Sequence, residues 1–320
     1  MSRLVLTLFL ILPIVCFSGN KKVNPPVIFK NAEILNANTT RIPFKLVDHL
    51  MVVQAELLDK KGSFIIDTGA EAMILNQVHF NNLYEFHKNS KEVSGVNDVL
   101  DYSYEKRIDA FDLSGFRLEN KVSDVIDLSH VEKSKKIKLL GIIGYDVLKD
   151  YEVFVDLYLK QITLTKTDKK GNPLNDKIYL ETIVDSLDFT LKKHTIVVNA
   201  LINNQKLKLG IDTAAEFNQI NKSVNKKALR YFIPKKRLKL SDAGGKSIRV
   251  LAGKLHRVKL NNNVYFGPMY TVLTNLNQLN ETFGTQLDGI LGYEFFAQKR
   301  TIINYKKEKL YFIDYPLNTQ

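Results

Sequence analysis

Short apolar runs rich in β-branched and aromatic residues recur along most of the chain, and Asn, Gly and Asp separate them. Runs of about four to eight such residues, bounded by turn-forming residues, are typical of β-strands. The clearest examples lie at residues 50–57, 63–66, 195–202 and 206–211. Asn203-Asn204, between the last two runs, is typical of a tight hairpin turn. The pattern predicts an all-β fold.

Helical signals are few and short. They lie around residues 76–84 and 223–231, and directly after two Gly-Tyr pairs, at 144–145 and 292–293. We therefore expect mostly strand with minor helices.

Two different motifs each occur twice, in the same order. Asp-Thr-Gly-Ala-Glu at 67–71 recurs as Asp-Thr-Ala-Ala-Glu at 212–216, and Gly-Ile-Ile-Gly-Tyr at 141–145 recurs as Gly-Ile-Leu-Gly-Tyr at 289–293. The distance from the Asp to the second Gly is 77 residues (144 − 67) in the first copy and 80 (292 − 212) in the second. Two motifs at nearly equal spacing indicate a duplicated unit.

The duplication predicts the domain organisation. We expect a leader at residues 1–18, an N-terminal lobe at 26–166 and a C-terminal lobe at 178–315. The polar, turn-rich stretch at 167–177 is typical of a linker between them.

Composition narrows the possible chemistry. The 320 residues are 45% hydrophobic and 25% charged, as in ordinary globular proteins. The single cysteine, Cys16, excludes a disulfide framework, and a chain without its first 18 residues would have no thiol nucleophile or thiolate ligand. The net charge of +12 is spread along the chain, so it describes the surface and does not predict nucleic acid binding.

The N-terminus predicts export. Arg3 precedes an apolar run at residues 4–15, and the small residues Ser18 and Gly19 follow it, which is the pattern of a cleaved signal peptide. The run is too short to span a bilayer comfortably, so we expect no transmembrane span after its removal. Lipid anchoring through Cys16 is the alternative, although the residues before it match such signals poorly. Either route gives a periplasmic, envelope or secreted protein.

The repeated aspartates, Asp67 and Asp212, are the candidate chemistry. An Asp at the end of a buried strand is costly unless it is hydrogen-bonded or shares a proton. Because the two stand at equivalent places of a duplicated unit, a pseudo-twofold axis would bring them together. Neighbouring carboxylates cannot both ionise cheaply, so the pair would hold one proton and supply a general base and a general acid around one water.

The paired motifs, Asp-Thr-small-Ala followed by apolar-apolar-Gly, resemble the two active-site halves of aspartic proteases. The resemblance is closest to bacterial retropepsin-like aspartyl proteases, with two halves in tandem, and it covers the chain from about Pro26 to Tyr315. It implies a bilobal acid-protease fold and an aspartic endopeptidase that cleaves peptide or protein substrates. It also implies a monomer whose halves form an intramolecular pseudo-dimer.

The resemblance implies roles for particular residues. Asp67 and Asp212 would be the catalytic dyad, and Thr68 and Thr213 would brace the two loops by hydrogen bonds across the interface. Gly69 would let the backbone pass close to a carboxylate. No cofactor or metal is expected, and the six histidines contain no His-Glu-x-x-His zinc pattern.

Two departures from the family pattern concern the same loops. Ala214 stands where glycine is usual, which adds a methyl group beside the second loop. Ala70 and Ala215 replace a hydroxyl residue that pepsins use to hydrogen-bond a catalytic carboxylate. With fewer hydrogen bonds to the ionised form, the pKa values of the dyad should be depressed less, so we expect an activity optimum nearer neutrality than pepsin's.

The family also implies a hairpin flap over the site. The candidate tips are Gly95 and Val96 in the first half, and Gly244 and Gly245 in the second. Two alternatives to an active protease remain open at this point. The chain could be a catalytically inactive, protease-like envelope binding protein, or an interaction module of two separate domains whose aspartates never meet.

Overall fold

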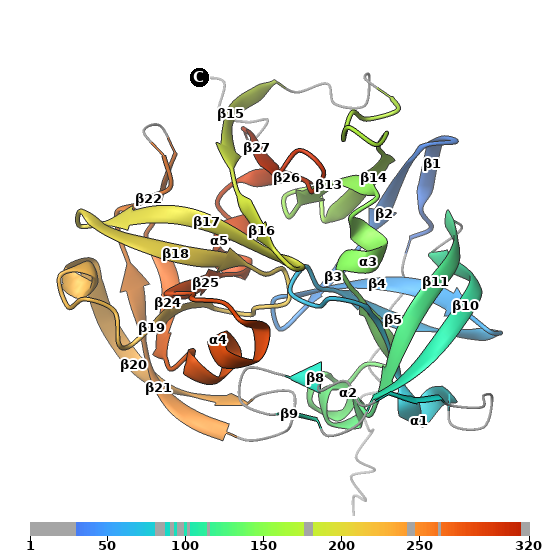
Figure 1. Cartoon of the computed structure of the whole chain (residues 1–320), viewed down its shortest axis with the longest axis horizontal. Helices are drawn as coiled ribbons and strands as arrows, with labels where there is room; N and C mark the ends of the chain where they lie inside the picture. The colour runs from blue at the N-terminus through green and yellow to red at the C-terminus, as the bar shows by residue number, and fades with distance from the viewer. Residues whose placement is uncertain are drawn as a thin grey trace, which may run out of the picture.

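The computed structural model describes residues 30–80, 87–89, 93–94, 99–100, 103–113, 116–175, 182–241, 247–261 and 264–314. These residues form an eight-stranded sheet, a ten-stranded sheet, a seven-stranded sheet and one two-stranded pair. Figure 1 shows two lobes side by side, blue to green on the right and yellow to orange on the left, with the seven-stranded sheet beside both. The predicted all-β bilobal fold is confirmed.

The sheet of the N-terminal lobe curls nearly closed. Its strand order is β3-β4-β5-β12-β6-β11-β10-β7, and β4 also pairs with β10. The strands are β3 Lys45–Val47, β4 Leu50–Leu57, β5 Lys60–Ile66, β6 Met73–Asn76, β7 His87–Asn89, β10 Ser103–Leu113, β11 Phe116–Ile126 and β12 Leu139–Ile143. The apolar run expected at 50–57 is therefore one strand, and the run at 63–66 is the buried end of β5.

The C-terminal lobe contains the same central unit. Its path is β20-β21-β24-β19-β25-β18-β17-β22-β23, with β16 beside β17. The strands are β16 Thr190–Lys192, β17 Thr195–Ile202, β18 Gln205–Ile211, β19 Asn218–Asn221, β20 Phe232–Ser241, β21 Ser247–Leu255, β22 Val258–Lys259, β23 Tyr265–Phe266, β24 Met269–Thr274 and β25 Gly289–Leu291. Asn203 and Asn204 both have positive φ, as the expected hairpin turn requires.

The two lobes match strand for strand around the repeated motifs. In the first, β12 runs parallel to β5 and antiparallel to β6. In the second, β25 runs parallel to β18 and antiparallel to β19. Each Asp-Thr motif thus follows the second strand of a hairpin, and each Gly-Tyr motif follows the parallel strand beside it. The residue boundaries predicted for the leader, lobes and linker stay predictions.

The seven-stranded sheet joins the lobes. Its order is β1-β2-β14-β13-β26-β27-β15, so strands from both halves meet at the central antiparallel pair β13–β26. The strands are β1 Glu33–Asn36, β2 Thr39–Pro43, β13 Tyr151–Asp156, β14 Gln161–Lys166, β15 Ile183–Asp188, β26 Arg300–Asn304 and β27 Lys309–Ile313. One apolar core runs from the N-terminal sheet through Val153 and Ile303 into the C-terminal sheet. The lobes therefore fold against a common base.

The helices are short, as expected. They are α1 Gln77–Phe80, α2 Ser129–Lys135, α3 Tyr145–Leu148, α4 Asn277–Phe283, α5 Tyr293–Phe296 and the 3₁₀ turn η1 Ala228–Tyr231. Of the helix predicted around residues 223–231, only η1 forms. The N–H of Lys227 donates to the side chain of Asn225, which favours a local turn there. The helices α2 and α4 were not predicted from the sequence. A short pair, β8 Val93–Ser94 with β9 Val99–Leu100, completes the described elements.

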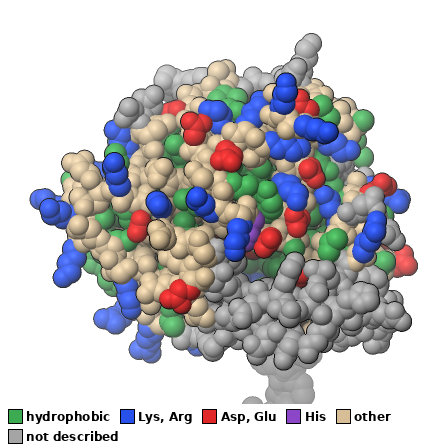
Figure 2. All heavy atoms as spheres, in the orientation of Figure 1, with side chains coloured by type: hydrophobic (Ala, Val, Ile, Leu, Met, Phe, Trp, Pro, Cys, Tyr) green, Lys and Arg blue, Asp and Glu red, His purple; other side chains and the backbone are tan. Residues whose placement is uncertain are grey.

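The outer surface is mixed in charge. Figure 2 shows Lys and Arg side chains scattered over the visible face, with Asp and Glu between them. No helix within the described ranges is long and apolar enough to cross a membrane.

An ion pair is buried where the halves meet in the shared sheet. Nε and Nη2 of Arg300 lie 2.9 and 2.7 Å from Oδ2 of Asp156, and both side chains are at most 1% exposed. In the same pair of strands, β13 and β26, Glu152 lies opposite Asn304, and Nδ2 of Asn304 donates to Oε2 of Glu152 at 2.9 Å. Breaking such a pair leaves an uncompensated charge, which costs far more than losing an exposed pair.

We predict that Arg300→Met strongly destabilises the fold. The carboxylate of Asp156 would stay buried without its cation, at a cost of about 3–5 kcal/mol in the free energy of unfolding. Arg41→Met is the matched control, because Arg41 lies in β2 of the same sheet and its 3.4 Å pair with Glu33 is exposed. That loss should stay below about 1 kcal/mol. Urea unfolding measures both, and equal losses would contradict the prediction.

Candidate active site

The two aspartates occupy equivalent places at the strand ends. Asp67 follows β5, and its backbone N–H donates to the carbonyl of Ile143 at the end of β12, with an N–O distance of 3.0 Å. Asp212 follows β18, and its N–H donates to the carbonyl of Leu291 in β25, also at 3.0 Å. The parallel strand beside each hairpin thus fixes where the chain leaves the sheet and turns toward the other lobe.

Reciprocal threonine hydrogen bonds join the two loops. The N–H of Thr68 donates to Oγ1 of Thr213 at 3.0 Å, and the N–H of Thr213 donates to Oγ1 of Thr68 at 3.0 Å. Each hydroxyl in turn donates to a strand carbonyl of the opposite lobe, that of Ile211 at 3.4 Å or Ile66 at 2.9 Å. Thr68 is 0% and Thr213 1% exposed. The structure therefore brings these predicted residues together across the lobe interface.

The carboxyl groups meet above this threonine network. Oδ1 of Asp67 accepts hydrogen bonds from the N–H groups of Gly69 at 2.7 Å and Ala70 at 3.1 Å. Oδ1 of Asp212 accepts one from the N–H of Ala214 at 2.7 Å. The Asp67 loop lies directly against Asp212, since a Cβ on Gly69 would stand 2.8 Å from Cγ of Asp212. A hydrogen bond between the two carboxyls contributes to the pKa of both, and such a bond requires a proton on one of them. The alternative of separate domains whose aspartates never meet is therefore wrong.

Burial and the neighbouring charge set the protonation of this pair. Burial raises the pKa of Asp67, and the charge of Asp212 raises it further, so that it lies well above its ordinary value. Burial also raises the pKa of Asp212, although backbone N–H groups and the hydrogen bond from Asp67 act against this. The proton belongs to the pair. Such a pair holds one basic and one acidic carboxyl together, as general acid–base chemistry requires.

Gly69 lies directly against the opposite carboxyl group. A Cβ placed on Gly69 would stand 2.8 Å from Cγ and 2.9 Å from Oδ2 of Asp212. The equivalent residue, Ala214, carries a methyl group, which packs at the margin of an apolar cluster of the N-terminal lobe that includes Leu50 and Val52. The two loops therefore differ: one requires glycine for close approach, and the other has room for alanine.

The two Gly-Tyr motifs support the aspartate loops from behind. A Cβ on Gly144 would stand 2.2 Å from the carbonyl oxygen of Ala72, and one on Gly292 would stand 2.1 Å from that of Ala215. The N–H of Tyr145 donates to the carbonyl of Ala70, and the N–H of Tyr293 donates to the carbonyl of Ala215, each with an N–O distance of 2.9 Å. These contacts explain why both copies keep glycine before the tyrosine.

Three residues near the dyad were not predicted from the sequence. Tyr305 is buried, its pKa is raised first by burial, and the charges of Asp67 and Asp212 act on it, so its hydroxyl stays protonated. His49 and His194 lie at the lobe interface next to the aspartate loops. A signal for the histidines exists in the sequence, because both stand 18 residues before their aspartate (67 − 49 and 212 − 194).

The structure does not test the flap prediction. Gly95, Val96, Gly244 and Gly245 all lie outside the described residues. The flap therefore stays a prediction.

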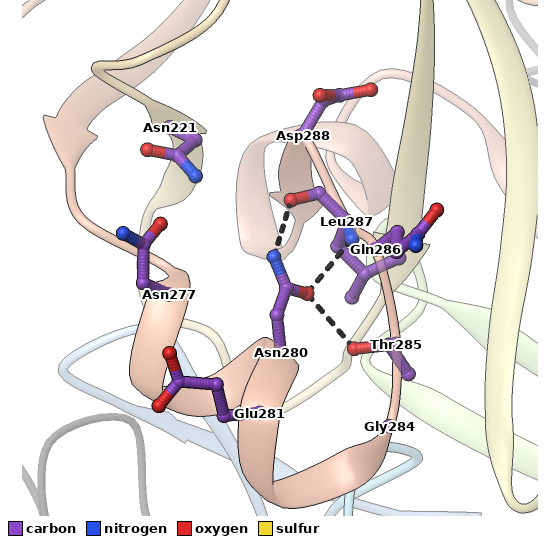
Figure 3. A pocket seen from close by; sticks show the side chains of 9 residues that line it. All are labelled: Asn221, Asn277, Asn280, Glu281, Gly284, Thr285, Gln286, Leu287 and Asp288. Atoms are coloured by element: carbon purple, nitrogen blue, oxygen red, sulfur yellow. Dashed lines mark hydrogen bonds between the residues drawn. The ribbon is translucent and has the colours of Figure 1, made fainter.

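A polar surface hollow beside α4 is a separate feature. It is lined by Asn221, Asn277, Asn280, Glu281, Thr285 and Asp288, among others, and includes no residue of either aspartate loop. Figure 3 shows Asn280 bonded to its own neighbours: it donates to the carbonyl of Leu287 and accepts from Leu287 N–H and Thr285 Oγ1. These hydrogen bonds stabilise the turn that lines the hollow. Among the described residues, no three His, Cys, Asp or Glu side chains gather as a metal site would need.

Comparisons with known proteins add a distant likeness. No family model matches the chain, and no curated protein matches it. A solved structure that matches is a retropepsin-like aspartic protease from Rickettsia conorii, with 15% identity and a TM-score of 0.30. The match covers 40% of this chain and 90% of that one.

We predict unequal effects for opposite changes at the two equivalent loop positions. Gly69→Ala would press a methyl group against the carboxyl of Asp212, which should cost about 1–3 kcal/mol of stability. Ala214→Gly creates no clash and should cost about 0.5–1 kcal/mol through backbone freedom. Urea unfolding at one pH compares the two variants. A Gly69→Ala protein as stable as its parent would show that the loop has room there.

The raised pKa values also predict a pH dependence of stability. A carboxyl whose pKa is higher in the folded state favours folding below its unfolded pKa, and this contribution is lost as pH rises through the folded pKa. Asp67→Asn removes the costly second ionisation, so the stability of this variant relative to the parent should increase from about pH 4 to pH 8. Unfolding curves across this range measure the difference.

Asp59→Asn is the control for this pH series. Asp59 lies exposed in the β4–β5 turn with positive φ, a conformation that asparagine also adopts. Its stability should follow that of the parent at every pH. A parallel pH course for Asp67→Asn and Asp59→Asn would contradict the shared-proton arrangement.

Proposed function

We propose that the protein is an aspartic endopeptidase that hydrolyses peptide bonds with a water activated between Asp67 and Asp212, outside the cytosol. The observation that carries the proposal is the placement of the Asp67 loop directly against the carboxyl of Asp212, held by the reciprocal Thr68–Thr213 bonds. The direction of both pKa shifts supports a proton shared between the two carboxyls. A water between such carboxyls can lose a proton to one while the other donates to substrate.

The proposed reaction runs in two steps. The ionised carboxyl of the dyad takes a proton from water, and the water oxygen attacks the carbonyl carbon of the scissile peptide. The protonated carboxyl donates to the oxygen of that carbonyl as negative charge develops there. In the second step, the carboxyl that took the proton from water gives a proton to the leaving nitrogen. The other carboxylate takes a proton from a hydroxyl of the tetrahedral intermediate, and the C–N bond breaks to release the acid and the amine. The pair alternates between the two protonation states, so neither aspartate is permanently the acid.

The loop contacts support a dyad that works nearer neutrality than pepsin's. Ala70 and Ala215 carry no side-chain hydroxyl to stabilise an ionised carboxylate, and burial is the first cause of the raised pKa of each aspartate. Since activity needs exactly one proton on the pair, raised pKa values move the active range upward in pH. The expected pH profile has its maximum above the strongly acidic range.

The location and assembly form part of the same proposal. The charged and apolar start of the chain supports export through a cleaved signal peptide, with lipid attachment at Cys16 as the alternative. One chain supplies both aspartates, so a monomer suffices for the site. Peptides or proteins outside the cytosol would be the substrates.

Cleavage of a mixed peptide pool by the purified mature protein tests the proposal. Asp67→Asn and Asp212→Asn should each lower the cleavage rate by about a thousandfold or more, because each removes one member of a unit that works jointly. Asp59→Asn should leave the rate unchanged. A pepstatin-type inhibitor should block the parent.

The possible results separate the protease from the binding protein. Cleavage that persists in both aspartate variants would refute the dyad. A folded parent that binds peptides but cleaves none would instead support the catalytically inactive binding protein. Mass spectrometry of the products distinguishes these cases and gives the cleavage sites.

A further inference from the structure

Two histidines cross the lobe interface at equivalent positions of the duplicated unit. His49 lies in the β3–β4 turn and His194 in the β16–β17 turn. They are 145 residues apart (194 − 49), the same offset that separates Asp67 from Asp212 (212 − 67). Each histidine contacts the aspartate loop of the other lobe.

His49 reaches from the N-terminal lobe onto the loop that follows Asp212. Its Nδ1 donates to the carbonyl of Glu216, with an N–O distance of 3.1 Å. Its ring stacks on Tyr293 at a centroid distance of 4.1 Å and meets Phe217 edge-on at 5.8 Å. The ring therefore packs against both motifs that define the second loop.

His194 makes the reverse crossing. Its ring is 2% exposed, and burial lowers the pKa of His194. A hydrogen bond with the backbone of Gly69 opposes this lowering of the pKa, as a carbonyl acceptor does. Its Nδ1 lies 3.7 Å from Oε2 of Glu71. Gly69 in turn donates its N–H to Oδ1 of Asp67 at 2.7 Å. A chain of two contacts thus links His194 to a carboxyl of the dyad.

The ion pairs beside the two histidines differ. Beside His49, Nζ of Lys135 lies 2.5 Å from Oε1 of Glu216 and 3.3 Å from Oδ2 of Asp48, so a permanent cation also ties the lobes together. Glu71 instead pairs with the imidazole of His194, and its side chain is 70% exposed. The Asp67 loop therefore depends on its histidine more than the Asp212 loop does.

We propose that His194 is a positioning residue for the dyad, which holds the backbone of Gly69 so that the Gly69 N–H stays on the carboxylate of Asp67, and that His49 does the weaker equivalent for the Asp212 loop. In the reaction proposed above, neither histidine touches substrate. Each lobe thus fixes the geometry of the other lobe's aspartate.

Burial and the surrounding charges determine the protonation state in which His194 holds the Asp67 loop. Burial lowers the pKa of His194, Lys193 acts in the same direction, and Glu71 and Asp146 oppose them. Asp212 also faces the ring, and a charge on His194 would lower the pKa of Asp212. The net lowering keeps the ring neutral near pH 7. A neutral hydrogen-bond donor of similar reach can therefore replace it.

Three variants of His194 and His49 test the inference. His194→Leu fills the buried space without a donor, and kcat should fall by about ten- to a hundredfold with KM changed less than about threefold. His194→Gln restores the donor and should recover most of kcat. His49→Leu should lose less than His194→Leu, because Lys135 still fastens its side. His256→Leu, in the β21–β22 turn, is the control and should match the parent.

A second measurement does not need activity. Carbon-13 NMR of the aspartate carboxyls follows the titration of the dyad, and His194→Leu should move it to higher pH because the Gly69 bond to Asp67 is weakened. His194→Gln should return it. If His194→Leu does not fold, His194→Met replaces it. The inference rests on the proposed function only for its kinetic part.

The results separate the two proposals. A parent that cleaves no peptide would refute the endopeptidase, while the dyad titration would still decide the role of His194. A folded His194→Leu protein with the kcat and dyad titration of the parent would overturn the inference. A folded His194→Gln protein that recovers neither would overturn it as well.

Discussion

The meeting of two carboxyl groups from different lobes is the constraint on which the rest of the structure depends. Neither carboxyl can be buried beside the other unless a proton is shared and the backbone on both sides is held still. The reciprocal bonds between Thr68 and Thr213 supply that restraint without a charge, because each residue offers an N–H donor and a hydroxyl. Both hydroxyls are then anchored to strand carbonyls, so the loops move only if the sheets move.

Everything behind the loops serves the same restraint. The parallel strands β12 and β25 hold the aspartate backbones, and Gly144 and Gly292 let the chain pass close beneath. The shared sheet and the continuous core then fix one lobe against the other. The site is therefore a property of the interface, and it tolerates differences between the halves only where space allows, as at Gly69 and Ala214.

The sequence predicted the parts of this arrangement that repeat. Asp67 and Asp212 could be paired because the same motifs recur at nearly equal spacing, and the strands followed from apolar runs bounded by turns. The side-chain contacts across the shared sheet, such as that of Arg300 with Asp156, could not be predicted, because they depend on the register of β13 against β26, which no local pattern encodes. His49 and His194 were missed for a related reason: a lone histidine carries no signal until the repeat offset is applied to it.

The buried pairs of the shared sheet also determine which halves can associate. Under the 148-residue offset that relates Gly144 to Gly292, Glu152 corresponds to Arg300 and Asp156 to Asn304. Two first halves joined in the same register would set a glutamate opposite an aspartate, both inside the protein and without a cation. The buried pairs of the shared sheet therefore require two unlike halves, and a symmetric pairing of two first halves is disfavoured. A substitution at one member of a buried pair, such as Asp156, would therefore need a matching substitution at its partner in the other half, such as Arg300.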